Sequence, residues 1–388
     1  MKTLGPKGPS YKLRDMSKTN HKLPDIVRAT AEFEKWASRH VHMVQSDVKL
    51  KHQNMARAAF PFFRATFYRW AQWWPIICPE LARAPQVLAV GDLHVENFGT
   101  WRDLEGRLIW GVNDFDEAWP ASYAADLVRL VSSAYLAIEE EHLSITRKKA
   151  CRAIEQGYRD SLAKGGGPFV LAEHHRWLRL VALNKLRDPV VFWKKILACP
   201  RYKGVLPKDV WKLVHALMPL RTLNYELKSR IAGLGSLGHP RVLALATWDG
   251  AHIVREAKQL TPSAWIWARK LHTTQILSRK LVATAMRIRD PHVHFAEHWI
   301  VRRLAPDCCH IEISSLPEER DEEKLAYYMG WETANIHLGS PKAIPAIRRD
   351  MAAREERWLH KAAKAMLKVT LDDWKVWRRK SGYLSKTN

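Results

Sequence analysis

Two short segments of the chain carry most of the side chains that enzymes use to bind metals and move protons. The first reads GDLHVENFG (91–99) and the second reads VNDFDE (112–117). Carboxylates at strand ends that face a cleft remain ionised only beside a cation or another polar partner, so this pattern predicts a metal site. The plainer alternative is that these residues only form turns around a hairpin, because turns use Asp, Asn and Gly. The candidates are Asp92, His94, Asn97, Asp114, Asp116 and Glu117.

The spacing of these residues resembles the active centre of the protein-kinase-like superfamily, particularly its small-molecule phosphotransferase branch. The catalytic loop there has the form HGDLHxxN, and a later strand ends in DF or DW. The resemblance implies that Asp92 accepts the hydroxyl proton of the acceptor, while Asn97 and Asp114 bind the magnesium that bridges the phosphates. Asp116 is a further candidate metal ligand. The His that usually precedes the Gly is absent, and His94, which follows Asp92, is the second candidate for a catalytic role.

Two more positions are expected to support this loop. Asp126, in AADLVRL, resembles the DLA sequence that follows the metal hairpin in those phosphotransferases, where the Asp caps a helix or braces the loop. Arg64 and Lys51 flank the sequence FPFF and could reach a phosphate, although a place on a helix face is the favoured interpretation. We therefore expect Asp126 and Arg64 to have structural roles.

A glycine-rich segment, GLGSLG, lies between a short apolar stretch and a β-rich stretch. Backbone N–H groups can cradle phosphate oxygens where no Cβ intrudes, so this segment is a candidate nucleotide-binding turn. A Rossmann fold would need a helix next, whereas Pro240 and a β-rich stretch follow, which favours a hairpin. The candidate residues are Gly233, Gly235, Ser236 and Gly238.

The cation that pairs with the phosphates would lie on the strand that ends in VREAK. Lys258 is the better residue type, but Arg255 better fits the alternation of that strand, so both remain candidates. No Asp or Glu occurs over 261–289. The usual lysine–glutamate ion pair of kinases therefore has no obvious acid, and Glu256 or Glu297 would have to serve.

The order of these motifs is permuted relative to an ordinary kinase, in which the glycine turn and the cation precede the catalytic loop. The same order occurs in a bacterial family known only as domain of unknown function 2252, which the chain resembles over about residues 51–340. Two departures are Arg255, where that family usually has Lys in a KEA sequence, and His-Leu-Gly near His337, where it has an AHA-type helix. The family has no assigned reaction. The resemblance rests on KHQNMARAAFPFFRA, GDLHVENFG, NDFDEAWPASYAADLVRL, GLGSLG, VREAK, WIVRRL and WETANIHLGS.

The apolar periodicity predicts that most of the chain is helical. Apolar residues at three- and four-residue spacing run from about 23 to 74, with a break at Pro61, and helices return after Pro120. The acid-free segment is expected to form one long basic helix, 262–289, and two or three helices end the chain. A further helical stretch is expected at 177–186.

Strands are expected in two small regions far apart in the sequence. The first holds strands at about 86–91 and 105–114, with a loop and a hairpin turn between them. The second holds three short antiparallel strands over 231–258, with a tight turn at 248–250, and a further strand follows at 298–304.

The predicted fold class is α+β, mostly helical and protein-kinase-like, with the elements of the nucleotide lobe after the catalytic loop. Four regions are expected to form one integrated domain. They are 1–85 (an N-terminal helical region), 86–225 (a helical lobe with the catalytic loop and metal hairpin), 226–315 (a small β-rich region like a nucleotide lobe) and 316–388 (basic C-terminal helices).

The composition excludes some classes of protein. The 388 residues are 47% hydrophobic and include 18 Trp, which excludes intrinsic disorder and small disulfide-stapled scaffolds. The net charge of +23 permits nucleic-acid binding, but solvated helix faces are the favoured explanation. Five Cys form no disulfide framework or zinc motif, and no apolar run approaches the ~18 residues that a membrane helix needs. We expect a reducing, cytoplasmic location and no membrane span.

The leading functional hypothesis is a phosphotransferase that uses Mg²⁺ and ATP and acts on a small-molecule or protein acceptor that the sequence does not identify. A nucleotidyl transferase with the same fold and a catalytically degenerate nucleotide-binding protein are the main alternatives. A metallophosphoesterase is less favoured, because the later GNHE and GHxH segments of that class are absent. A nucleic-acid-binding protein is also less favoured.

Overall fold

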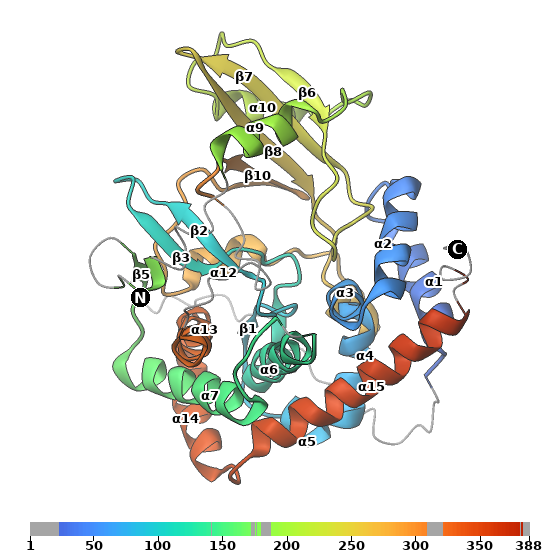
Figure 1. Cartoon of the computed structure of the whole chain (residues 1–388), viewed down its shortest axis with the longest axis vertical. Coiled ribbons are helices and arrows are strands. Elements are labelled where there is room, and N and C mark those ends of the chain that lie inside the picture. The colour runs from blue at the N-terminus through green and yellow to red at the C-terminus, as the bar shows by residue number, and fades with distance from the viewer. Residues whose placement is uncertain are drawn as a thin grey trace, which may run out of the picture.

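The computed structural model describes residues 23–140, 142–171, 175, 177–179, 188–308, 321–380 and 382. These residues form a mixed α+β fold that is about half helical and contains several antiparallel sheets. Figure 1 shows one twisted sheet standing above a helical body. The helix expected at 177–186 lies largely outside the described residues. The helices are α1 (Ile26–Ala37), α2 (Gln45–Arg57), α3 (Ala59–Ala65), α4 (Phe67–Ile77), α5 (Pro79–Ala82), α6 (Tyr123–Glu139), α7 (Arg147–Lys164), α9 (Pro189–Leu197), α10 (Lys208–Ala216), α11 (Ala264–Ala268), α12 (Ser278–Thr284), α13 (Glu322–His337), α14 (Ile344–Ala353) and α15 (Trp358–Lys380).

The strands form three sheets within the described part of the chain. The sheet above the helical body is antiparallel and has the order β6-β7-β8-β10-β9. A second sheet has the order β2-β3-β5, and β1 pairs with β4 in a third. The strands are β1 (Gln86–Ala89), β2 (Phe98–Arg102), β3 (Leu108–Val112), β4 (Trp119–Ser122), β5 (Phe169–Val170), β6 (Glu226–Ser229), β7 (Arg241–Trp248), β8 (Ala251–Gln259), β9 (His294–Ala296) and β10 (Trp299–Leu304).

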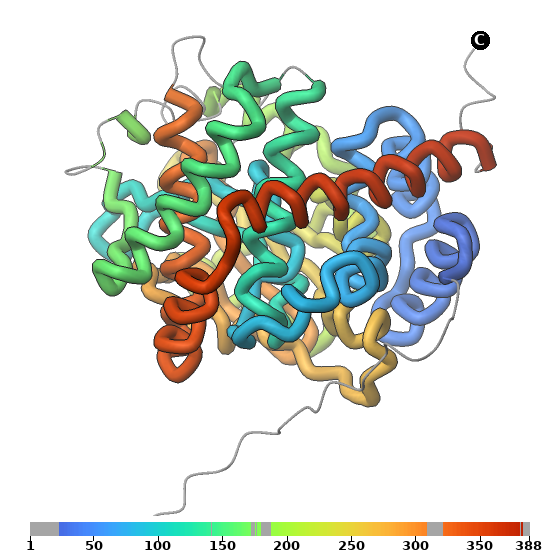
Figure 2. Tube along the Cα trace, turned by 90° about the horizontal axis from the view of Figure 1, so that it is seen from below, coloured from blue at the N-terminus to red at the C-terminus, as the bar shows by residue number. Residues whose placement is uncertain are grey.

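Helix α6 runs through the centre of the helical body. All of its residues from Tyr123 to Ala137 are buried, as expected for a helix that is apolar on nearly every side. Helices α7 and α13 pack with their backbones in contact, since a Cβ on Gly157 would lie 1.9 Å from the carbonyl oxygen of Tyr327. Figure 2 shows α15 crossing the underside of the body. The core therefore combines segments from both ends of the described chain.

A buried ion pair joins α15 to the N-terminal helices. Arg69 on α4 donates from Nε to Oδ2 of Asp373 on α15 at 2.7 Å. Trp73 also donates its ring N–H to the same carboxylate oxygen at 2.7 Å. This carboxylate is therefore held by two donors from α4 and fixes where α15 crosses that helix.

Most strands expected from the sequence are confirmed, and two expected helical features are wrong. The turn at 248–250 is confirmed as the two-residue connection between β7 and β8, with positive φ at Asp249 and Gly250. Pro61 does not break the helix there, because it lies in the first turn of α3, where backbone N–H groups need no helical partner. The chain instead breaks at Ala58, which is extended (φ −149°, ψ 160°).

The long basic helix expected at 262–289 is wrong. The segment forms the short helices α11 and α12 with irregular chain between them. Lys270 adopts a left-handed conformation (φ 53°), which ends the first of these helices. Trp265 on α11 packs among the aromatic rings of Phe67 and Trp70, so tertiary packing prevails over the helical pattern. In the described residues, no helix combines the length and the apolar character that crossing a bilayer requires.

Candidate functional site

A cleft of about 390 Å³ opens between the helical body and the sheet that contains β7 and β8. Its walls come from the N-terminal helices, the loops that follow β1 and β3, and the glycine-rich segment between β6 and β7. A smaller recess of about 100 Å³ adjoins it and also contacts Asp114 and Asp116. Lys258 lines this recess. The predicted site residues that line the larger cleft are Arg64, Asp92, His94, Asn97, Asp114, Asp116, Glu117, Gly233, Gly235 and Ser236.

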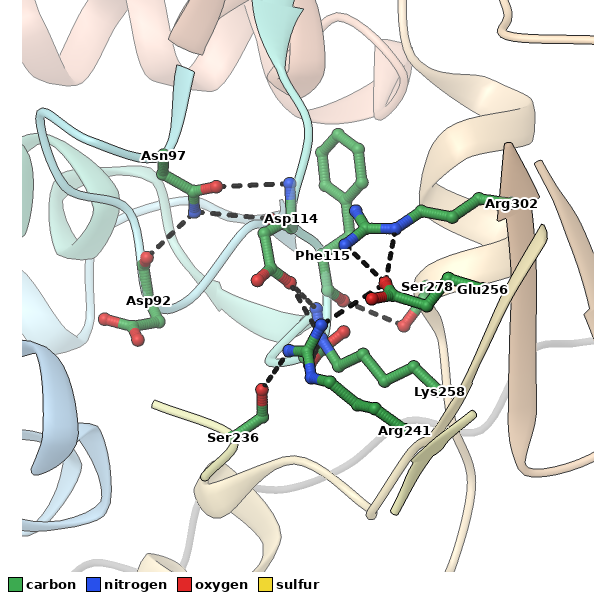
Figure 3. Close-up of polar contacts among 11 residues, drawn as sticks. Asp92, Asn97, Asp114, Phe115, Ser236, Arg241, Glu256, Lys258, Ser278 and Arg302 are labelled. Atoms are coloured by element: carbon green, nitrogen blue, oxygen red, sulfur yellow. Dashed lines mark hydrogen bonds and ion pairs between the residues drawn. The ribbon is translucent and has the colours of Figure 1, made fainter. Parts of the chain in front are cut away.

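Asn97 joins the loop after β1 to the segment after β3 through hydrogen bonds. Its Nδ2 donates to the backbone oxygen of Asp92 at 3.0 Å and to that of Asp114 at 3.3 Å. Its Oδ1 accepts a hydrogen bond from the backbone N–H of Asp114 at 3.1 Å. Figure 3 shows this exchange between the loop after β1 and the end of β3. The spacing noted in the sequence thus corresponds to a direct contact between the two motifs.

Asp92 has a counterion that sequence reasoning missed. Arg129, which is completely buried on α6, donates from Nε to Oδ1 of Asp92 at 2.7 Å. Its Nη2 also donates to the backbone oxygen of Phe63 at 3.0 Å, and its guanidinium lies over the Phe63 ring. Burial raises the pKa of Asp92, and the charge of Arg129 opposes that rise. The second oxygen, Oδ2, faces Gly235.

Asp126 and a glycine shape the start of the loop that follows β1. From the first turn of α6, the carboxylate of Asp126 accepts the backbone N–H groups of Val90 (2.7 Å) and Gly91 (2.9 Å). Nε2 of His337 lies 3.0 Å from the same carboxylate. Gly91 has φ 88°, and a Cβ there would lie 2.4 Å from the carbonyl oxygen of Glu117. Only glycine fits this turn without moving the backbone.

The acidic pair after β3 faces Lys258. The Lys258 side chain is only 3% exposed, and its ammonium forms an ion pair with Asp116 and lies 3.8 Å from Oδ1 of Asp114. Burial raises the pKa of Asp116 to about 6, and the negative charge of Asp114 adds to this rise. Lys258 is therefore the cation of β8 that reaches the acidic segments.

Arg255 lies on the opposite face of β8 and lines neither the cleft nor the adjoining recess. Its guanidinium donates to the backbone oxygen of Leu217, which follows α10, at 2.9 Å. Ile253 and Ala257 share this face and pack in the cluster beneath α10. The alternation expected from the sequence holds, but the face that carries Ile253 is the one turned away from the cleft. Of the two candidate cations, Arg255 therefore lies outside the cleft, whereas Lys258 lines the adjoining recess.

Glu256, next to Arg255, sits at the centre of three arginines. It is completely buried and makes ion pairs with Arg230, Arg241 and Arg302. Burial alone would raise its pKa, but the arginines hold that pKa well below the usual range. Glu256, one of the two acids considered as the partner of the lysine, thus lies on the same strand as Lys258 and binds arginines instead (Figure 3).

The glycine-rich segment lies directly over Asp92. A Cβ on Gly235 would lie 3.3 Å from the backbone oxygen of Arg64 and 3.6 Å from Oδ2 of Asp92. Ser236 accepts a hydrogen bond from Arg241 at 2.6 Å. Gly238 lies outside the cleft, where its carbonyl oxygen accepts the N–H of Val44 at 2.8 Å. The segment joins the antiparallel strands β6 and β7, so the expected hairpin is confirmed, but its connection is a long loop and not a tight turn.

Glu117 is a second buried carboxyl at the cleft. Its Oε2 accepts hydrogen bonds from the Ser263 hydroxyl (2.8 Å) and the Ala264 backbone N–H (2.6 Å). Burial raises its pKa to about 8, and the nearby carboxylates Asp92 and Asp116 add to the rise. Glu117 is therefore protonated more readily than an exposed glutamate.

His94 and Arg64 line the cleft beside Asp92. The ring Nδ1 of His94 accepts the backbone N–H of Glu96 at 3.2 Å, and its ring meets Phe60 edge-on. Arg64 on α3 forms an ion pair with Glu96. The Arg64–Glu96 ion pair thus joins α3 to the loop that follows β1, which is a structural role of the kind expected for Arg64.

The residues that could hold a magnesium ion are few. In the described chain, no three or more His, Cys, Asp or Glu side chains come together as a metal site. Asp114 and Asp116 offer hard carboxylate oxygens, while Asn97 already uses its amide on both sides. Magnesium commonly binds through one or two carboxylates plus substrate phosphates and water. The donor set therefore fits a magnesium ion that arrives with a phosphate ligand, with Asp114 and Asp116 as its protein ligands.

Sequence reasoning missed Arg129 and the arginines around Glu256. One signal was present for Arg129, because a lone cation inside the apolar stretch ADLVRLVSSAYLA must find a buried partner. Arg230, Arg241 and Arg302 come from three different strands or loops and had no comparable signal. Their convergence is visible only in the folded chain.

Comparison with known proteins gives one family match, which covers residues 43–185. No curated protein and no solved structure matches the chain. The matched segment contains Asp92, Asn97, Asp114 and Arg129, whereas the glycine-rich segment and Lys258 lie beyond it. Residues 43–185 match the model of the family DUF2252, described as an uncharacterized protein conserved in bacteria.

Proposed function

We propose that the protein is a phosphotransferase that uses Mg²⁺ and ATP and has a kinase-like active centre in permuted order. One observation carries the proposal: Asp92 and Asp114, bridged by Asn97, share one site with Lys258, which lies 144 residues further along the chain than Asp114. A loop carboxylate, a metal-binding carboxylate and a buried lysine are the parts that kinases use for phosphoryl transfer.

The sheet gives further support. In kinases a glycine-rich loop covers the phosphates and a lysine follows on the third strand of the small lobe. Here the glycine-rich segment joins β6 to β7, and Lys258 lies on β8, the third strand of its sheet in chain order. The adjoining recess, with Phe115, Phe295 and Ile300 in its walls, has the apolar character that suits a planar base.

Each role in phosphoryl transfer can then be assigned to a residue of this chain. Asp92 is positioned to accept the proton of the acceptor hydroxyl through Oδ2, because Oδ1 is occupied by Arg129. A raised pKa brings a general base closer to the pH at which it works. The acceptor oxygen attacks the γ-phosphorus, and the bond to the β–γ bridging oxygen breaks to release ADP. Magnesium, held by Asp114 and Asp116, would neutralise the charge of the phosphates.

One observation favours a second candidate, a nucleotide-binding protein without catalysis. Lys258 forms its ion pair with Asp116, and among the described residues no acid of α11 or α12 takes the place of the usual partner glutamate. A lysine that stays on this carboxylate would compete with magnesium. Nucleotide binding without turnover is the result that distinguishes this candidate.

The test is thermal denaturation of the full chain with ATP, with Mg²⁺ and with both. A ligand that binds only the folded state stabilises it by about 2.7 kcal/mol at 100 times its Kd. We expect the melting temperature to rise with Mg²⁺ and ATP together, and the Asp114→Ala variant to lose the magnesium-dependent part of that rise.

A matched pair of variants serves as control. Lys258→Met should weaken the nucleotide effect, whereas Arg255→Met, which alters the opposite face of β8, should retain it. ADP release from ATP then separates an enzyme from a binding protein. If no nucleotide changes the melting temperature of the wild-type chain, the phosphotransferase proposal is wrong.

A further inference from the structure

Lys51 is a buried cation without a matching anion. It lies on α2 with 5% of its surface exposed, and its ammonium donates to the backbone oxygen of Gly235 at 3.2 Å. It forms no ion pair with any residue that the structure describes. Burial lowers its pKa, although Glu34, Glu117 and Asp92 favour the charged form from a distance. Placing an ammonium in the interior without a counterion is unfavourable, so an anion is expected to complete this site.

The three acids that face Lys51 are each satisfied elsewhere. Glu34 binds His52 at 2.6 Å, and Asp92 binds Arg129 at 2.7 Å. Glu117 accepts hydrogen bonds from the Ser263 hydroxyl at 2.8 Å and from the Ala264 backbone N–H at 2.6 Å. Because none of them compensates Lys51 directly, the cleft beside it remains open to a negatively charged group.

Other cations lie near Lys51 in the cleft. Nδ1 of His239 is shielded from solvent and has no hydrogen-bond partner in the described chain. Burial lowers the pKa of His239 to about 3, and the charges of Lys51, Lys258 and Arg241 lower it further. Nε of Arg64 is likewise shielded and unpartnered within the described residues. An anion that entered here would meet the ammonium of Lys51 and the unpartnered Nε–H of Arg64.

Lys51 and Asp92 lie close to the same glycine in the cleft. The ammonium of Lys51 donates to the Gly235 carbonyl oxygen at 3.2 Å, and Oδ2 of Asp92 would lie 3.6 Å from a Cβ on Gly235. One small ligand beside Gly235 could therefore meet both groups. The stacked rings of Phe33 and Tyr68, whose centroids are 4.2 Å apart, line the same cleft.

We propose that Lys51 binds the anionic group of a small acceptor, a hydroxyl compound that carries a carboxylate or a phosphate. The inference rests on the proposed phosphotransferase function, because it assigns the acceptor side of that site. The anion binds Lys51 in place of the Gly235 carbonyl, and the acceptor hydroxyl then lies against Asp92. Its oxygen bonds to the γ-phosphorus of ATP, its proton passes to Asp92, and ADP leaves with the electrons of the broken bond.

The experiment uses three probes of similar size: glycerate, glycerol 3-phosphate and glycerol. Melting temperatures of the full chain are measured with each probe, and ADP release is measured with each probe in the presence of Mg²⁺ and ATP. We expect glycerate or glycerol 3-phosphate to stabilise the protein and stimulate ADP release more than neutral glycerol. Which anion acts best identifies the carboxylate or the phosphate as the recognised group.

Two buried lysines provide a matched comparison, since Lys51 and Lys258 are 5% and 3% exposed. Lys51→Met should weaken binding of the active anionic probe about 10- to 100-fold, as expected for loss of a hydrogen bond to a charged group. The effect of Mg²⁺ and ATP should remain in this variant. Lys258→Met should show the reverse pattern.

The outcomes separate the two proposals. The assignment of Lys51 is overturned if Lys51→Met leaves probe binding unchanged, or if only Lys258→Met abolishes it. It is also overturned if neither anion has an effect, or if glycerol has the same effect as the anions. Probe binding that depends on Lys51, without any effect of nucleotide, leaves the anion site in place and refutes the phosphotransferase. Should Lys51→Met not fold, Lys51→Arg displaces the charge instead, and unaltered probe binding in that variant overturns the assignment.

Discussion

The ion pair between Arg129 and Asp92 gives a prediction whose size follows from its burial. Arg129 is completely buried and the side chain of Asp92 is 19% exposed. Removing one partner of such a pair leaves an uncompensated charge and costs about 3–5 kcal/mol. Arg129→Met also loses a hydrogen bond to the backbone oxygen of Phe63, worth about 1 kcal/mol, although methionine keeps contact with the Phe63 and Phe67 rings. We expect a loss of about 4 kcal/mol for this variant.

Asp92→Asn leaves Arg129 charged and is expected to lose about 3 kcal/mol for the same reason. In the double variant neither charge is left alone, so its loss should stay near that of Arg129→Met. This leaves about 3 kcal/mol of coupling between the two positions. Urea unfolding of the wild type and the three variants measures that coupling. If the two single losses add to within about 0.5 kcal/mol, the ion pair does not stabilise the loop as argued.

Two further predictions concern the helical body. Burial raises the pKa of Glu332 to about 7, so between pH 4.5 and 7 the folded state keeps a proton that the unfolded state releases. The free energy of unfolding should therefore fall as the pH rises from about 4.5 to 7. Glu332→Gln should reduce this fall, measured by urea unfolding at several pH values. An unchanged pH dependence would contradict the assignment. Gly157→Ala would place a Cβ 1.9 Å from the Tyr327 carbonyl oxygen and should lower the free energy of unfolding by about 1–3 kcal/mol or more. The control is Gly167→Ala, whose Cβ would meet no atom within 4 Å. Its free energy of unfolding should stay within about 0.5 kcal/mol of the wild type. Equal stabilities of the two alanine variants would refute this account of the α7–α13 contact.

Local sequence signals predicted the parts of the site that depend on short-range structure. Asp92 and Asn97 lie in the loop between β1 and β2, and Asp114 lies just after β3, so the three residues are close in sequence and their spacing already indicated a shared site. The turn before β8 was predicted equally well, because Asp249 and Gly250 have the residue types that a positive φ favours.

Contacts between residues that lie far apart in the sequence could not be predicted from local sequence signals. The face of β8 that meets the cleft depends on where α10 packs, and residue type together with alternation left Arg255 and Lys258 both open. The arginines around Glu256 converge from separate strands, and Lys51 meets Gly235 across 184 residues. The long basic helix failed for a related reason, since the packing of Trp265 against the aromatic rings of α4 overrides a local helical pattern.

The ion pair between Arg69 and Asp373 bears on the order in which the chain matures during synthesis. The two residues are 304 positions apart, so at about 5–20 residues/s the ribosome needs about 15–60 s to deliver the partner of Arg69. Until then the face of α4 that carries Arg69 and Trp73 has neither its counterion nor the covering helix. The N-terminal wall of the cleft is therefore synthesised first, but it gains its final contacts only when α15 packs against α4.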